Sequence, residues 1–328
     1  MKSRHNRRPI LLATVCLAVI AATVLLGGGS RNPFDLFADG NGAILALRLW
    51  RVGLGVVVGA SLALAGTAFQ ALLRNPLADP YVLGISGGSG IAAAAAIASG
   101  ALAAAGTWVL PASGFAGAMI SLAVVYSLAR VHGRASSHTL VLAGVAWGAL
   151  CGSVLTYIVS RSSAEGLHAL IWWFLGDLQV YNRPLAVIAA TSCAVGAALL
   201  MMRARALDAL LLGDEAAAHL GIRPERERLI LLLLAAWLVA LSVTASGLIG
   251  FVGLVAPHTA RAIVGSGHRR LLPAAALIGA AFLCLGDGIG RVALYPGELP
   301  VGVFTSVVGA PFFLLLLRGR RREIWTGT

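Results

Sequence analysis

Long apolar stretches alternate with short polar connections along the whole chain, and this pattern predicts a helical membrane protein. A helix needs about 20 mostly apolar residues to cross the hydrocarbon core of a bilayer. The apolar runs are continuous rather than alternating residue by residue, which argues against a membrane β-barrel. The predicted spans cover approximately residues 9–28, 44–73, 82–105, 108–130, 138–161, 184–203, 228–246, 250–265, 271–290 and 300–318. We therefore expect an all-α polytopic fold with about ten transmembrane helices, forming a single domain over residues 1–328.

Composition supports this class. The chain is 59% hydrophobic and 12% charged, with a mean hydropathy of +0.88, whereas a typical soluble domain is about 25% charged. A net charge of +12 would suggest nucleic-acid binding in a soluble protein. In a membrane protein the same charge orients the helices, so no nucleic-acid partner is expected.

The distribution of Lys and Arg predicts the orientation of the chain. With the N-terminus inside, nineteen of the 25 Lys and Arg residues fall in inner segments and six in outer ones. Cytoplasmic loops carry this excess of positive charge. Both termini are therefore predicted to be cytoplasmic. The apolar run after MKSRHNRRP is kept as a first span, because no small-residue cleavage site follows it cleanly.

Glycine pairs at four-residue spacing indicate close helix packing. The pairs Gly55/Gly59, Gly84/Gly88 and Gly286/Gly290 each form a GxxxG pattern. Small residues at this spacing let membrane helices approach closely.

The residue types that would carry chemistry are scarce. The one lysine is Lys2, so the chain has no ATP-binding P-loop of the form GxxxxGK[ST]. The four cysteines and seven histidines lack metal-ligand spacing, and we expect no catalytic residue, no metal site and no cofactor bound by this chain.

Asp287 lies one helical turn from Arg291, which favours a structural ion pair over a proton relay. The near absence of central carboxylates argues against an ion-coupled secondary carrier for a small organic solute, the main alternative function. A membrane enzyme, which needs a cluster of reactive side chains, is favoured still less.

A polar island interrupts the apolar pattern over residues 206–228. It holds five of the thirteen acidic residues. Gly213 and Gly221 divide it into two short predicted helices, with Asp214 and Glu215 in the first turn of the second, where negative charge favours the helix dipole. From composition alone, the island is equally consistent with a docking element and with a solvated loop.

Five motifs resemble those of the membrane permeases of type II ATP-binding-cassette importers, in the same order along almost the whole chain. They are TAFQALLRNPLADPYVLGISGG (67–88), LLGDEAAAHLGI (211–222), GLIGFVGLVAPHTARAIVG (247–265), HRRLLPAAALIGAAFL (268–283) and ELPVGVFTSVVGAPFFLLLL (298–317). This family imports iron-siderophores, haem and cobalamin. The resemblance implies a homodimer in the bacterial inner membrane, with two ATPase subunits that bind ATP and Mg²⁺ and an extracytoplasmic substrate-binding protein.

The resemblance also assigns roles to residues. It implies that residues 206–222 form coupling helices that dock on the ATPase. Three groups of positions match: Asp214, Glu215, Ala217, Leu220 and Gly221 for ATPase coupling; Arg48, Arg51 and Arg291 for docking of the binding protein; and Asn75, Leu77, Ser137 and His138 for a cytoplasmic gate. By the same resemblance, the fifth and tenth predicted spans line a path along the dimer axis.

Three points stay open at the level of sequence. Trp50 replaces the usual proline of the family in RLWR, so the local turn and the direction in which the Arg48 and Arg51 side chains point stay undetermined. Trp172 and Trp173 are either interfacial aromatics or an apolar wall for a flat ligand. The cargo itself is not determined, because selectivity in this family resides largely in the binding protein.

Overall fold

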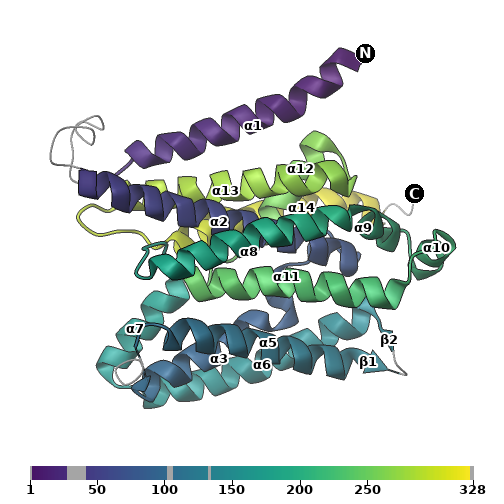
Figure 1. Cartoon of the computed structure of the whole chain (residues 1–328). Helices are drawn as coiled ribbons and strands as arrows, with labels where there is room; N and C mark the ends of the chain where they lie inside the picture. Colours follow the sequence, from purple (N-terminus) through teal and green to yellow (C-terminus); the bar gives the residue numbers. More distant parts are fainter. Residues whose placement is uncertain (1, 28–41, 102–105, 132–133, 326–328) are drawn as a thin grey trace.

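Helices lying side by side form almost the entire fold (Figure 1). The computed structural model describes residues 2–27, 42–101, 106–131 and 134–325. Within these ranges six helices are long and apolar enough to cross a membrane: α2 (Gly42–Leu72), α5 (Val109–Ala129), α6 (Ser137–Arg161), α8 (Arg183–Met202), α11 (Pro224–Ser246) and α13 (His268–Ala293). Four shorter apolar helical stretches accompany them: Pro9–Leu25 in α1 (Lys2–Leu25), α3 (Ile85–Ala98), α12 (Val252–Val264) and Val301–Leu316 in α14 (Val301–Trp325). These ten stretches correspond to the ten predicted spans.

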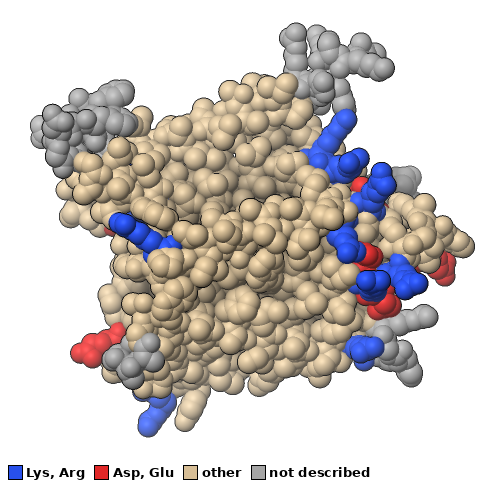
Figure 2. All heavy atoms as spheres, viewed as in Figure 1, with Lys and Arg blue, Asp and Glu red and all other residues tan. Residues whose placement is uncertain are grey.

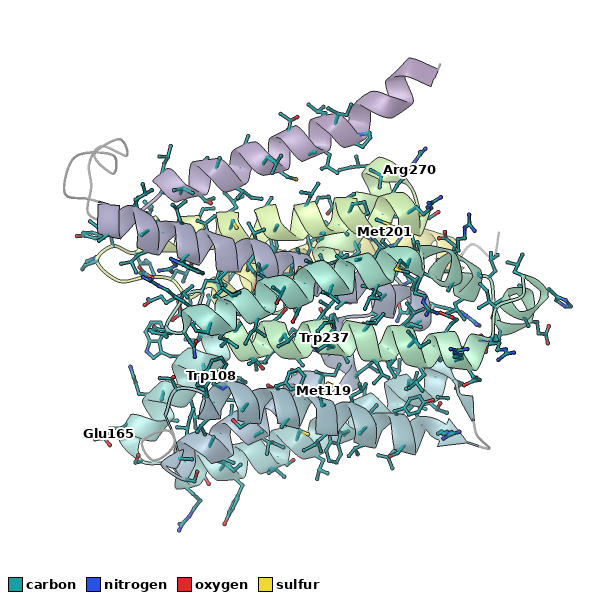
Figure 3. All side chains as sticks on the ribbon, in the orientation of Figure 1. Trp108, Met119, Glu165, Met201, Trp237 and Arg270 are labelled. Atoms are coloured by element: carbon teal, nitrogen blue, oxygen red, sulfur yellow. The ribbon has the colours of Figure 1, made fainter. Side chains whose placement is uncertain are left out.

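The remaining elements lie at the two ends of the bundle (Figure 1). At one end are α9 (Ala204–Leu211), α10 (Asp214–His219) and the pair of two-residue strands β1 (Arg130–Val131) and β2 (Arg134–Ala135). At the other end lies α7 (Ala164–Leu175), where Figure 3 labels Glu165. The start of α1 and the end of α14 lie toward the end that carries α9 and α10. Lys and Arg side chains also gather there (Figure 2), as the charge distribution predicted for the inner end.

The third span begins later than the sequence predicted. Asp79 accepts a hydrogen bond from the Tyr81 amide and caps the 3₁₀ turn η2 (Pro80–Leu83). Gly84 then takes φ +71°, a conformation open mainly to glycine, and α3 starts at Ile85. Gly84 is therefore a turn residue outside the helix, but its pair still packs closely as predicted: a Cβ on Gly84 would overlap Trp147 of α6, and one on Gly88 would overlap the Gly117 carbonyl of α5.

Helix α2 is at the centre of the bundle and packs against α13, α11 and α12. Its most apolar 18-residue window is 78% buried, against 11% for the window of α6. The approach of α2 to α13 depends on glycine as predicted: a methyl group on Gly59 would overlap the carbonyl of Gly279, and one on Gly279 would overlap that of Gly59. Gly290 packs equally closely against the chain, since an added methyl group there would overlap the Leu299 carbonyl.

A single methyl group on Gly66 is expected to destabilise the bundle. Gly66 of α2 faces the Gly253 backbone of α12, and an added Cβ would overlap the carbonyl oxygen. Overpacking of this kind costs about 1–3 kcal/mol. Gly66→Ala should therefore lower the melting temperature in detergent, measured by the loss of monodisperse protein on gel filtration after heating. Gly53→Ala is the matched control, since no atom lies within 4 Å of a Cβ at that position of the same helix. Equal melting temperatures for the two variants would contradict this packing.

Candidate functional site

The polar island forms the two short helices that the sequence predicted. Helix α9 ends before Gly213, whose φ of +116° separates it from α10. Asp214 and Glu215 occupy the first turn of α10. Gly221 at φ +78° follows α10, and Pro224 begins α11. Two glycines in conformations that other residues rarely adopt therefore determine the shape of the segment.

Asp214 is bound within its own chain. Its carboxylate accepts hydrogen bonds of 2.8 and 2.9 Å from Arg228 of α11, which is 3% exposed, and pairs with Arg74 after α2. Loss of water raises the pKa of Asp214, but the hydrogen bonds and charges of Arg228 and Arg74 outweigh that effect and hold it below its ordinary value. The ionised carboxylate thus ties α10 to α11 and to the end of α2.

The exposed part of the segment is smaller than the sequence predicted. Glu215 is exposed and has no ion pair to any residue in the described ranges. Leu220 is 64% exposed, and Gly221 is exposed beside it. Ala217 is fully buried against the rest of the chain, so it anchors α10 and its side chain is not on the outer surface. Leu212 is 70% exposed, and sequence reasoning missed it although an apolar residue beside Gly213 was the available signal.

Helix α9 is attached to α13. Asp208 accepts hydrogen bonds from the backbone amide of His268, at 3.0 Å, and lies 2.6 Å from its Nδ1. His268 is fully buried at the start of α13. The two short helices are therefore connected to α2, α11 and α13.

The two predicted gate segments meet at the end of the bundle that carries α9 and α10. The Ser137 hydroxyl donates to the Leu72 carbonyl at the end of α2, at 2.9 Å. Asn75 lies three residues further on, and its side chain accepts a 3.0 Å hydrogen bond from the Leu77 amide. His138 is exposed beside Ser137. The structure thus places these segments side by side, while their function as a gate stays a prediction.

Arg74 joins the gate segment to the short helices, a link that sequence reasoning missed. It precedes Asn75 in the chain, adopts φ +48°, and donates through Nε to the Leu210 carbonyl of α9 at 2.9 Å. It also pairs with Asp214 of α10. One side chain therefore contacts both short helices from the first residue of the gate loop.

All three predicted docking arginines contact their own chain at the opposite end. Arg48 donates to the Val24 and Leu25 carbonyls at the end of α1, each at 3.3 Å, where a cation is favoured by the helix dipole. Arg51 pairs with Asp287 at 2.8 Å and with Glu298 at 2.9 Å. These bonds hold both side chains in defined positions on α2.

Arg291 lies in the interior rather than at an exposed rim. It is 5% exposed, pairs with Asp287 at 3.2 Å as predicted, and donates to the Thr23 carbonyl at 2.8 Å. Asp287 is itself 3% exposed. The carboxylate between two arginines compensates both, because a buried charge without a partner would be costly. Arg291 is thus buried in this structure, and its role in docking the binding protein stays a prediction.

The structure shows how Trp50 is accommodated. Helix α2 continues without a break from Gly42 to Leu72, so Trp50 causes no turn. The guanidinium of Arg183, the first residue of α8, lies 5.7 Å from the centre of the Trp50 ring. Such cation–π contacts are attractive and connect the first turns of α8 with the N-terminal part of α2.

A hollow of about 440 Å³ lies where several helices are interrupted. Between α11 and α12 the chain leaves helical geometry, with Gly247 at φ +70° and Phe251 at φ +66°. The Tyr81 hydroxyl donates to the Ile249 carbonyl at 2.8 Å and accepts from its amide at 3.0 Å, which satisfies backbone groups that have no helical partner. The hollow is lined by Tyr81, Ser86, Phe174, Leu175, Leu248, Gly250, Gly302, Val303, Ser306 and Val307.

Comparison with known proteins gives consistent matches. The sequence pattern of the FecCD transport family matches residues 10–319. A cobalamin import system permease of Halobacterium salinarum is 42% identical over 274 residues, covering 84% of this chain and 73% of that protein. A hemin transport system permease of Yersinia pestis is 40% identical, covering 85% of this chain and 84% of the relative. A Fe(3+)-citrate import system permease of Bacillus subtilis is 38% identical, covering 98% of each.

A solved structure shares the fold. It is a metal-chelate type ABC transporter in an inward-facing conformation, with a TM-score of 0.83 and 27% sequence identity. The match covers 94% of this chain and 99% of that one. The predicted permease fold is confirmed over nearly the whole length of the chain.

Proposed function

Because the chain belongs to the FecCD transport family, a family of membrane transport permeases, we propose that it works as the permease of an ATP-driven importer of metal chelates. In this proposal ATP and Mg²⁺ bind to two partner ATPase subunits, and a binding protein delivers the cargo on the outer side. The observation that carries the proposal is the pair of short helices α9 and α10, which project from the inner end with Glu215 and Leu220 exposed.

The contacts of Arg74 support a specific coupling route. Movement of the ATPase would displace α9 and α10, to which Arg74 is bound through Leu210 and Asp214. Asn75 follows directly, beside the Ser137 contact with α2. Helices α9 and α10 would therefore transmit a displacement to the gate through Arg74. The gate would open and close without any covalent bond being made or broken by this chain.

Exposed apolar faces support a dimer of two copies. Helix α6 carries Leu142 at 71%, Val145 at 59% and Tyr157 at 68% exposure. Helix α14 carries Val307 at 67% and Leu314 at 63%. We propose that a second copy covers parts of both helices and that the cargo moves between the copies, with the hollow beside α14 forming part of the path.

Outside the membrane, we propose that the binding protein docks near Arg48 and Arg51. Arg51 is 15% exposed, and one of its two partners, Glu298, is 41% exposed. A carboxylate of the binding protein would approach Arg51 from that side, and such a contact mainly affects orientation and encounter rate. Arg291 would support this surface from within.

The proposed cargo class follows from the names of the relatives. These proteins are described as permeases for cobalamin, hemin and Fe(3+)-citrate, which are all metal chelates. We propose a cargo of the iron-siderophore, haem or cobalamin type for this chain, in a bacterial cytoplasmic membrane with both termini inside.

Reconstitution tests the proposal. The chain is co-expressed with ATPase and binding-protein subunits that co-purify with it from its host, placed in liposomes, and supplied with radiolabelled iron-siderophore, haem or cobalamin. We expect uptake of one cargo that requires ATP and both partners. Uptake by the chain alone, driven by a proton or sodium gradient, would replace the proposal with a secondary carrier.

A further inference from the structure

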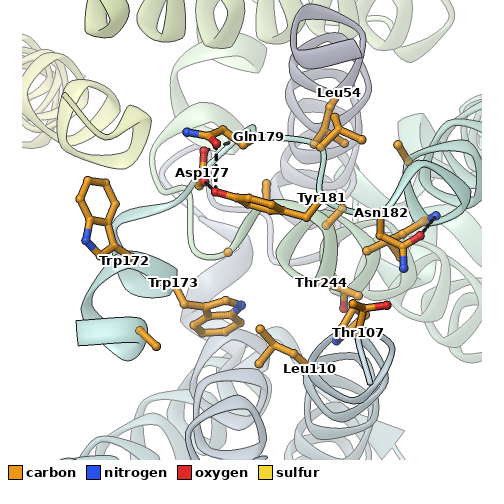
Figure 4. A pocket seen from close by; sticks show the side chains of 18 residues that line it. Leu54, Thr107, Leu110, Trp172, Trp173, Asp177, Gln179, Tyr181, Asn182 and Thr244 are labelled. Atoms are coloured by element: carbon orange, nitrogen blue, oxygen red, sulfur yellow. Dashed lines mark hydrogen bonds between the residues drawn. The ribbon is translucent and has the colours of Figure 1, made fainter. Parts of the chain in front are cut away.

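A second cavity of about 340 Å³, shown in Figure 4, lies beside α7, at the end of the bundle opposite α9 and α10 (Figure 1). Its walls come from α2, α5, α7, α8 and α11 and from the connection after α7. Most of the lining is apolar, including Leu54, Leu110 and Leu185. Three aromatic side chains, Trp172, Trp173 and Tyr181, also contribute. The volume corresponds to about eleven water molecules and falls at the lower end of the range for small-molecule sites.

One charged side chain, Asp177, belongs to this lining. None of the other lining residues is Asp, Glu, Lys, Arg or His. Asp177 follows Gly176 at φ +74°, and its amide donates to the Ser246 carbonyl at 2.8 Å, which holds the connection against the end of α11. No ion pair joins Asp177 to any residue in the described part of the chain.

Hydrogen bonds hold the Asp177 carboxylate in position. Oδ1 accepts from the Gln179 amide and Oδ2 from the Tyr181 hydroxyl, each at 2.9 Å. Desolvation is the largest cause, and the negative charge of Asp177 the next, of a rise in the pKa of Tyr181 to about 12. The Tyr181 hydroxyl therefore stays protonated and donates its hydrogen bond to Asp177. Each carboxylate oxygen has a second acceptor position left. The nearby cations Arg51 and Arg291 pair with Asp287 and Glu298 rather than with Asp177, which is the one charged side chain of the lining.

A buried hydroxyl of the lining also lacks a partner. Thr244 Oγ1 is inaccessible to water and makes no hydrogen bond within the described residues. Unpaired buried polar groups are costly and uncommon in proteins. A water-sized group in the cavity does not reach this oxygen, so Asp177 is the polar group of the lining that an occupant would pair with, and a purely apolar occupant would leave its charge without a counter-charge.

We propose that this outer cavity binds an organic ammonium group attached to an apolar or aromatic body. Aromatic faces attract such cations, and the carboxylate adds a charge-assisted hydrogen bond. An anion would be repelled by Asp177. A bare Ca²⁺ or Mg²⁺ ion would lack ligands, because these cations require about six or more oxygen donors. The ammonium group can come from a lipid headgroup or from a free amine.

The cavity is separate from the hollow proposed for the cargo, so this inference goes beyond the proposed function and does not rest on it. The two share a thin wall: Trp173 lines the cavity while Phe174 lines the hollow. The wall is closed by backbone contacts, since the Leu248 amide donates to the Trp173 carbonyl at 3.3 Å.

Isothermal titration calorimetry of the full chain in maltoside detergent, with 2-phenylethylammonium as the probe, tests the proposal. We expect saturable binding and an affinity at least about tenfold higher than that of 2-phenylethanol, an uncharged analogue of the same size. Asp177→Asn should weaken the binding by a similar factor while keeping an oxygen acceptor for the Gln179 amide. Glu165→Gln is the matched control, because Glu165 is an exposed carboxylate on α7 outside the cavity lining. It should bind the probe as the unmodified chain does.

Leu110→Trp is a second test of the cavity, and it leaves the charge of Asp177 unchanged. Leu110 points into the cavity (Figure 4), and a larger ring there should block the probe even if Asp177→Asn fails to fold. Absence of saturable binding, or equal affinity for the ammonium and the alcohol, would overturn the proposal. Repeating the titration in nanodiscs with and without phosphatidylethanolamine identifies the source: competition by this lipid indicates a headgroup, and no competition indicates a free amine.

Discussion

Glu215→Arg is expected to abolish most ATP-driven transport while leaving the permease folded. Glu215 is exposed at the start of α10 and forms no ion pair within the described residues, so its replacement breaks nothing inside the chain. A charge of opposite sign at a docking surface costs several kcal/mol when it faces a complementary partner. We expect coupled ATPase activity and cargo uptake in proteoliposomes to fall by at least about tenfold, with an unchanged melting temperature.

Two further variants make this result specific. Glu165→Arg carries the same change on an exposed residue of α7, at the other end of the bundle, and should leave ATPase coupling intact. Asp214→Arg should lower the melting temperature as well as the coupling, because it places a third cation against Arg74 and Arg228. If Glu215→Arg transports normally and still co-purifies with the ATPase, α10 is not the docking surface.

Asp287→Ala is expected to produce the largest loss of stability. The substitution leaves Arg51 and the buried Arg291 facing each other without the carboxylate between them. Removing one partner of a buried ion pair typically costs about 3–5 kcal/mol. The melting temperature should fall by roughly 5 °C or more, measured by gel filtration of heated samples. The loss should be accompanied by weaker capture of the binding protein, because Arg51 loses its position.

Glu298→Gln is the control for Asp287→Ala. Glu298 contacts the same arginine but is 41% exposed, and exposed ion pairs contribute only about 0–1 kcal/mol. Its melting temperature should stay close to that of the unmodified chain. A small effect of Asp287→Ala, equal to that of Glu298→Gln, would show that the buried cluster does not stabilise the end of the bundle opposite α9 and α10.

The sequence alone determined the features that depend on local patterns. Ten apolar stretches are enough to place the spans, because a helix in lipid must be apolar along its length and satisfy its own backbone. Gly213 and Gly221 predicted α9 and α10, since few other residues adopt their backbone angles. The pairing of Asp287 with Arg291 was also accessible, because residues four apart lie on one helix face.

Tertiary structure alone decided which partners distant residues have. The bonds from Arg51 to Asp287 and from Arg74 to Asp214 span 236 and 140 residues of the chain, and no local pattern signals them. Burial was equally undetermined: the sequence could not show that Ala217 and Arg291 face inward while Leu212 faces outward. The cavity around Asp177 likewise exists only because the ends of several helices stop around one turn. Side-chain partners and cavities depend on the packing of whole helices. The positions of the helices along the sequence depend mainly on whether each segment is surrounded by lipid or by water.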